Sequence, residues 1–138
     1  MHNFSRASGI AVERLVRNKI NCCYNKNIVN DVCSLSQDLR SSLLFDNYTM
    51  VLTVVVCQQL INSLDFEHVP KYAFLMSCLI AAKYTTEGLY ASDFEGVMEG
   101  VCNMEELLSC ERLLVEKVDF TNMSRRFLSF GNAMVRVC

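Results

Sequence analysis

Residues 72–84, YAFLMSCLIAAKY, decide the fold. Apolar residues fill most of this run, and Lys83 is its only charge. A run of this length that is apolar on nearly all sides is typical of a helix buried inside a domain. Pro70, just upstream, suits the first turn of a helix, where its missing N–H is not needed. We therefore expect a central helix over about 70–84.

A second conspicuous charge lies in residues 104–118, MEELLSCERLLVEKV. At about 100° per residue, a helix here places Glu111 near the middle of an apolar stripe formed by Met104, Leu107, Leu108, Leu114, Val115 and Val118. An unpaired carboxylate held away from water is very costly, so Glu111 needs a partner. Lys83 is the best candidate, and the pair forms a site hypothesis. A buried ion pair that merely joins two helices is the structural alternative.

Helices are expected in the rest of the chain as well. Gly and Pro are scarce, at five and one residues, and no repeat or low-complexity tract divides the sequence. Residues 48–64 contain three consecutive valines that also favour a strand, but the length of the run favours a helix. Asn47 or Tyr48 is expected to mark a turn, Ser92 to cap a short helix over 93–99, and Asn103 to cap the helix that carries Glu111. Further helices are predicted over 8–20, about 28–45 and 124–137.

Composition narrows the function classes. A chain of 138 residues that is 51% hydrophobic is large enough for one domain with a real core. The net charge of −2, with scattered Lys and Arg, disfavours nucleic-acid binding. No signal peptide is visible, and no apolar run approaches the roughly 18 residues of a membrane span. We expect a soluble intracellular protein.

The eight cysteines do not predict a metal or disulfide framework. There is no C-x-x-C, and His2 and His68 are not spaced as zinc ligands beside a cysteine. Most cysteines should be reduced core thiols, although the adjacent Cys22 and Cys23 could be exposed and reactive. No phosphate-binding loop or catalytic motif is present, so we expect neither a cofactor nor an enzymatic activity.

The chain resembles the cyclin family over residues 49–120. YTMVLTVVVCQQLINS resembles the second cyclin helix, VPKYAFLMSCLIAAKY the third with its "AxKY/F" ending, and SCERLLVEKVDF the fifth with its "MExxILxxLxF" pattern. A weaker likeness extends back to Ile28. The resemblance implies an all-α fold: a single five-helix cyclin box at 28–121, an N-terminal helical extension at 1–27 and a short C-terminal helical extension at 122–138. So short a box would suit a virus-encoded cyclin.

The resemblance also implies a partner. In cyclins, the lysine that ends the third helix and the glutamate of the fifth grip the regulatory C-helix of a cyclin-dependent kinase. By resemblance these residues are Lys83 and Glu111, with apolar contact area from Ile80, Tyr84, Val115 and Phe120. The protein would form a heterodimer with the kinase and activate it allosterically, in the nucleus or cytoplasm of a cell, or of a host cell if it is viral.

One family feature is altered. Cell-cycle cyclins carry an "MRAIL…W" patch that docks R-x-L substrates, and the aligned stretch here is IVNDVCSL, in which Val29 replaces the arginine. Ile28, Val32 and Leu35 would keep a degenerate apolar patch, so ordinary R-x-L docking is not expected. Two other classes remain open: a helical adaptor of the Bcl-2-like or death-domain-like kind, and a cyclin-fold transcription factor of the TFIIB-like kind.

Overall fold

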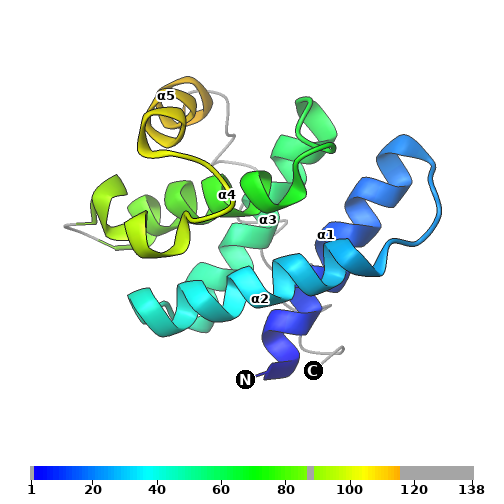
Figure 1. The fold of residues 1–138 in the computed structure, drawn as a ribbon, viewed down its shortest axis with the longest axis horizontal. Helices are drawn as coiled ribbons and strands as arrows, with labels where there is room; N and C mark the ends of the chain where they lie inside the picture. Colours follow the sequence, from blue (N-terminus) through cyan, green and yellow to red (C-terminus); the bar gives the residue numbers. More distant parts are fainter. Residues whose placement is uncertain (1, 87–88, 116–138) are drawn as a thin grey trace.

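The computed structural model describes residues 2–86 and 89–115, and within this part of the chain every regular element is helical (Figure 1). The all-α prediction is therefore confirmed. The C-terminal extension predicted at 122–138 lies outside the described residues. In chain order the elements are α1 (His2–Ile20), α2 (Lys26–Leu43), α3 (Asn47–Ser63), α4 (Pro70–Thr85), the 3-10 helix η1 (Ala91–Val97) and α5 (Met104–Val115).

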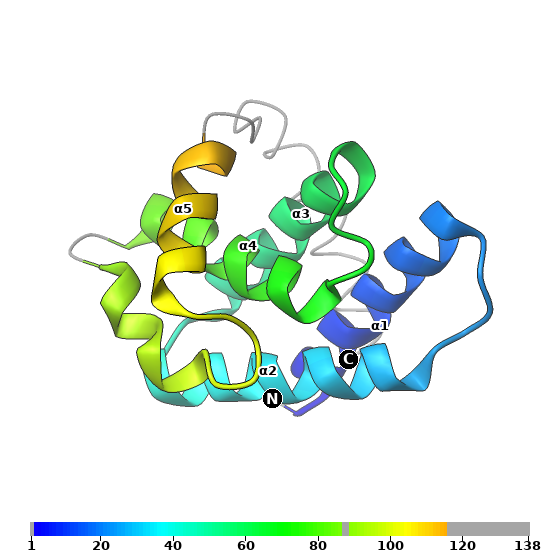
Figure 2. The same ribbon diagram turned by 45° about the horizontal axis from the view of Figure 1, so that its top comes forward.

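Helix α4 lies between α2 and α5 and packs along α3 (Figures 1 and 2). Helix α1 packs along α2 and also contacts α3 and α4. Its buried residues Ala7, Val12 and Val16 join the same hydrophobic core as the rest of the domain. Helix α1, which lies within the N-terminal extension predicted at 1–27, therefore packs on the shared core. None of the described helices combines the length and apolar character needed to cross a bilayer.

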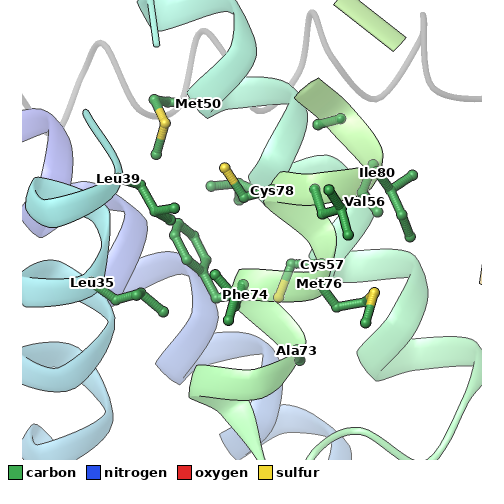
Figure 3. Packing of buried hydrophobic residues seen from close by; sticks show 14 of the residues in the cluster. Leu35, Leu39, Met50, Val56, Cys57, Ala73, Phe74, Met76, Cys78 and Ile80 are labelled. Atoms are coloured by element: carbon green, nitrogen blue, oxygen red, sulfur yellow. The ribbon is translucent and has the colours of Figure 1, made fainter. Parts of the chain in front are cut away.

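The core is centred on α3 and α4. Phe74 of α4 is fully buried, and its ring points toward Leu35 and Leu39 of α2 (Figure 3). The valine run at 54–56 is helical and fully buried. Neighbouring helices cover this segment on several sides, so tertiary packing overrides the strand preference of valine. Both central helices are therefore apolar nearly all round, as the sequence predicted for α4.

One of the two predicted helix caps is present and the other is not. Asn103 accepts a hydrogen bond from the Glu106 N–H at 2.8 Å, and the Glu106 carboxylate accepts from the Asn103 N–H at 3.2 Å, which confirms the predicted cap of α5. The turn before α3 comes earlier than predicted, because Asp46 caps this helix. The predicted Ser92 cap is also wrong. Helix η1 begins at Ala91, and the Asp93 carboxylate accepts a hydrogen bond from the backbone N–H of Tyr90, the residue before the helix.

Candidate functional site

Lys83 and Glu111 are in contact, as the sequence predicted. Lys83 lies in the last turn of α4, and its Nζ donates to Oε1 of Glu111 on α5. The Lys83 side chain is 37% exposed, whereas that of Glu111 is 12% exposed. The carboxylate is thus largely shielded, while the ammonium group stands at the rim. The contact joins two helices at the surface of the domain.

The apolar stripe predicted around Glu111 is only partly buried. Leu107, one turn earlier on the same face of α5, is fully buried against the core, but Leu108 is 40% exposed. Helix α5 therefore turns a narrow edge toward α4, and Glu111 lies along that edge. At the other end of the helix pair, the Tyr72 hydroxyl donates to the Glu106 carbonyl at 3.1 Å. These two polar contacts join α5 to α4 beside the packing of Leu107 on the core.

Within the described residues, the ion pair has unused hydrogen-bonding capacity. A lysine ammonium group has three donors and a carboxylate can accept about four hydrogen bonds, whereas the contact here joins one nitrogen to one oxygen. A partly exposed pair of this kind stabilises a protein by only about 0–1 kcal/mol. Stability alone therefore gives little reason for these residue types. The arrangement is well suited to present a donor and an acceptor side by side to backbone groups of another chain.

The apolar residues expected around the pair divide into three cases. Tyr84 is 58% exposed. Ile80 is 2% exposed, so its predicted contact with a partner is wrong for this structure, because it points into the α3–α4 core. The side chain of Val115 and all of Phe120 lie outside the described residues. Leu108, which the sequence placed on the inner stripe, instead adds exposed apolar area on α5.

The predicted degenerate docking patch on α2 is not an exposed surface. Val32 is fully buried, Leu35 is 4% exposed, and Ile28 is half-buried against the core. This correction has a simple cause: the apolar stripe of α2 is used to pack on α1 and α4. Beside Leu35 lies a small hollow of about 100 Å³ whose lining includes Asp31, Asp38, Lys71 and Glu99. These polar residues gave no signal in the sequence, because charged residues on a helix usually face solvent.

Two of the seven described cysteines, Cys57 and Cys78, lie in the core, fewer than the sequence predicted. All seven described cysteines are free, and no group of three potential metal ligands occurs among the described residues. Burial raises the pKa of Cys57 and of Cys78 to about 12, so both thiols stay protonated and unreactive. Cys22 and Cys23 are exposed. Nothing around them distinguishes a redox site.

Comparison of the chain with family models, curated proteins and solved structures gave no match. The fold and the site define an all-α domain that carries a cross-helix ion pair at its surface. This pair and its surroundings are therefore the described features that bear most directly on function.

Proposed function

We propose that this protein is a cyclin-like regulatory subunit that binds a cyclin-dependent kinase through Lys83 and Glu111. The observation that carries the proposal is the contact between these two residues at the surface junction of α4 and α5. Their residue types and sequence contexts resemble the kinase-gripping pair of cyclins. A generic helical adaptor, by contrast, has no use for such a pair. The six helical elements of the described residues, one of them the 3-10 helix η1, also suit a five-helix box preceded by one helix.

The surface around the pair suits a helical partner. Tyr84, next to Lys83 on α4, and Leu108, one turn before Glu111 on α5, are 58% and 40% exposed. Tyrosine is one of the residue types enriched in binding hot spots. The charges would fix the register of the partner, while the flanking apolar side chains would supply contact area.

The mechanism that follows is a population shift in the kinase. A kinase is active when its C-helix is turned inward, so that the glutamate of that helix pairs with the lysine that binds ATP. Lys83 would donate to carbonyl groups at one end of that helix, and Glu111 would accept from backbone N–H groups there. Contacts that only the inward position allows would stabilise it. No catalytic group of this chain takes part in the chemical step.

The decisive experiment separates a structural ion pair from a binding one. In the swapped variant Lys83→Glu/Glu111→Lys, the contact between α4 and α5 is restored with its charges exchanged. If the pair is only structural, this variant should behave like the wild type. If a kinase recognises the two charges, both the swapped variant and Lys83→Ala/Glu111→Ala should lose kinase captured from a cell lysate and identified by mass spectrometry.

A matched control removes two exposed charges elsewhere, Lys26 and Glu95, by substitution with alanine. We expect this variant to capture as much kinase as the wild type. Circular dichroism should show the same helicity for all variants, since an exposed pair contributes only about 0–1 kcal/mol. Undiminished kinase capture by the folded swapped variant would remove the basis of the proposal.

A further inference from the structure

A strained and exposed leucine ends helix α2. Leu44 has backbone angles φ 56° and ψ 35°, in the left-handed region that glycine and asparagine adopt far more easily than leucine. Its side chain is 85% exposed, the highest value among the large apolar residues of the described chain. Leu44 therefore costs stability through its backbone and regains little through its side chain. Folding alone gives no reason for a leucine at this position.

A hollow of about 460 Å³ opens directly beside Leu44. It lies where the end of α2, the start of α3 and the end of α4 come together on one side of the molecule (Figure 1). Its border includes Leu44 and Asp46 of the α2–α3 link, Tyr48 of α3, Tyr84 of α4 and Leu89 beyond α4. A protruding leucine and a hollow large enough to accept one thus lie side by side on the same surface.

The hollow is bordered mainly by uncharged side chains. Tyr48 and Tyr84 are 48% and 58% exposed, and Leu89 is half-buried. Asp46 is the one charged residue of the lining, and its carboxylate accepts a hydrogen bond from the Thr49 N–H at 2.9 Å at the start of α3. A strongly charged partner would find little to attract it here, whereas an uncharged surface of the same kind could approach with little electrostatic repulsion.

We propose that this surface pairs with the same surface of a second copy of the chain to form a twofold symmetric dimer. In such an interface one patch serves both copies, so it must supply both parts of every contact. A protruding side chain beside a hollow meets this requirement. Leu44 of each copy would lie in the hollow of the other, between Tyr48 and Tyr84.

The available area fits a weak dimer. Since burial of an aromatic side chain removes about 150–250 Å² from water, the exposed parts of Leu44, Tyr48 and Tyr84 amount to roughly 400 Å² per copy. Two copies contribute about 800 Å², and the polar lining residues bring the total close to the roughly 1,000 Å² that a specific interface needs. Interfaces below about 1,200 Å² are typically weak and transient. The chain is thus expected to pair at concentrations on the order of 100 µM.

The dimer would bury Tyr84, which is also next to Lys83 in the chain. A chain paired in this way could not present the same tyrosine to a kinase, so the two complexes would exclude each other. The pairing itself involves the purified chain alone. Its test therefore succeeds or fails whatever the outcome of the kinase-capture experiment.

The first test is sedimentation velocity of the full chain between about 5 and 500 µM. The weight-average mass should rise from the monomer value of 15.7 kDa toward twice that value. Leu44→Gly removes the protruding side chain and suits the left-handed backbone, so it should fold at least as well as the wild type and raise the dimer Kd about ten-fold or more. Tyr48→Glu should have the same effect, because it brings a charge into the patch of both copies, while an acidic residue is favourable in the first turn of α3. The control Ile20→Ala shortens an exposed apolar side chain at the end of α1 and should leave Kd unchanged.

A second test locates the interface. Backbone hydrogen–deuterium exchange, read by mass spectrometry, should slow with rising protein concentration in residues 43–49 and 82–86 and stay unchanged in residues 104–111 of α5. A chain that stays monomeric at about 500 µM would overturn the proposal and leave the patch to a different protein. A Kd unchanged in folded Leu44→Gly or Tyr48→Glu, growth beyond a dimer, or protection confined to other segments would also overturn it.

Discussion

Gly9 is the residue at which the packing of α1 on α2 can be tested most directly. A Cβ atom added there would lie 2.4 Å from the carbonyl oxygen of Val29, and 3.1 and 3.2 Å from its carbonyl carbon and Cα. All three are backbone atoms of α2, so no side chain can rotate away. Gly9→Ala therefore forces the two helices apart.

The size of the effect follows from two opposing terms. Ordinary van der Waals contact needs about 3.5 Å, so α1 must move by roughly 1 Å. Overpacking of this kind costs about 1–3 kcal/mol, and rigid backbone on the far side places Gly9 near the upper end. Alanine recovers about 1 kcal/mol through its higher helix propensity. The net loss is about 2 kcal/mol, or a fall in Tm of roughly 6–10 °C for a domain of this size.

Thermal unfolding followed by circular dichroism measures this directly, with urea unfolding as a second measurement. The matched control is Gly96→Ala, because a Cβ at Gly96 meets nothing within 4 Å. Its Tm should stay the same or rise slightly, since alanine restricts the unfolded chain. A Gly9→Ala protein as stable as the wild type would show that α1 does not lie against α2 in this way.

Two further predictions concern charges that hold α1 in place. Glu13 is 1% exposed, pairs with Arg17 at 3.1 Å and accepts a hydrogen bond from the Asn25 N–H at 3.1 Å. Glu13→Ala should therefore lower the free energy of unfolding, measured in urea, by about 1–3 kcal/mol. Glu13→Gln should lower it less, because the glutamine keeps an acceptor. Equal losses would contradict this account. Glu67 has a lowered pKa because it accepts hydrogen bonds from its own backbone N–H and from Lys19. The ionised Glu67 stabilises the fold above its unfolded pKa, and this stabilisation is lost as the pH falls through the lower pKa of the folded state. Between about pH 5 and pH 3 the Tm of Glu67→Gln should therefore fall less steeply than that of the wild type. Parallel Tm curves for the two proteins would refute this account.

The sequence predicts best where one pattern has one physical explanation. Residues 72–84 are apolar on nearly all sides, and only a buried helix suits such a run of this length. The sequence predicts the pairing of Lys83 and Glu111 because Lys83 is the only charge of its apolar run and Glu111 falls on the apolar stripe of its helix, so each needs a partner. These are local signals, and the structure confirms both the helix and the contact.

Predictions were weaker where the outcome depends on which neighbour covers a face. Ile80 and the α2 residues Val32 and Leu35 are apolar in either role, so composition cannot say whether a partner or the core covers them. Glu13 is the converse case. An (i, i+4) Glu and Arg pair on an amphipathic helix usually lies in solvent, and only the chain turning back at Asn25 buries it.

The position of the ion pair relative to the core bears on how the protein can bind a partner. The core is built mainly by α1 to α4, while α5 adds Leu107 as its one fully buried large side chain among the described residues. Lys83 and Glu111 lie on the outer edge of this arrangement. Substitutions at this pair change what the surface offers a partner with little effect on packing. Loss of kinase capture in a folded variant can therefore be attributed to the charges themselves, which is the condition that the capture experiment needs.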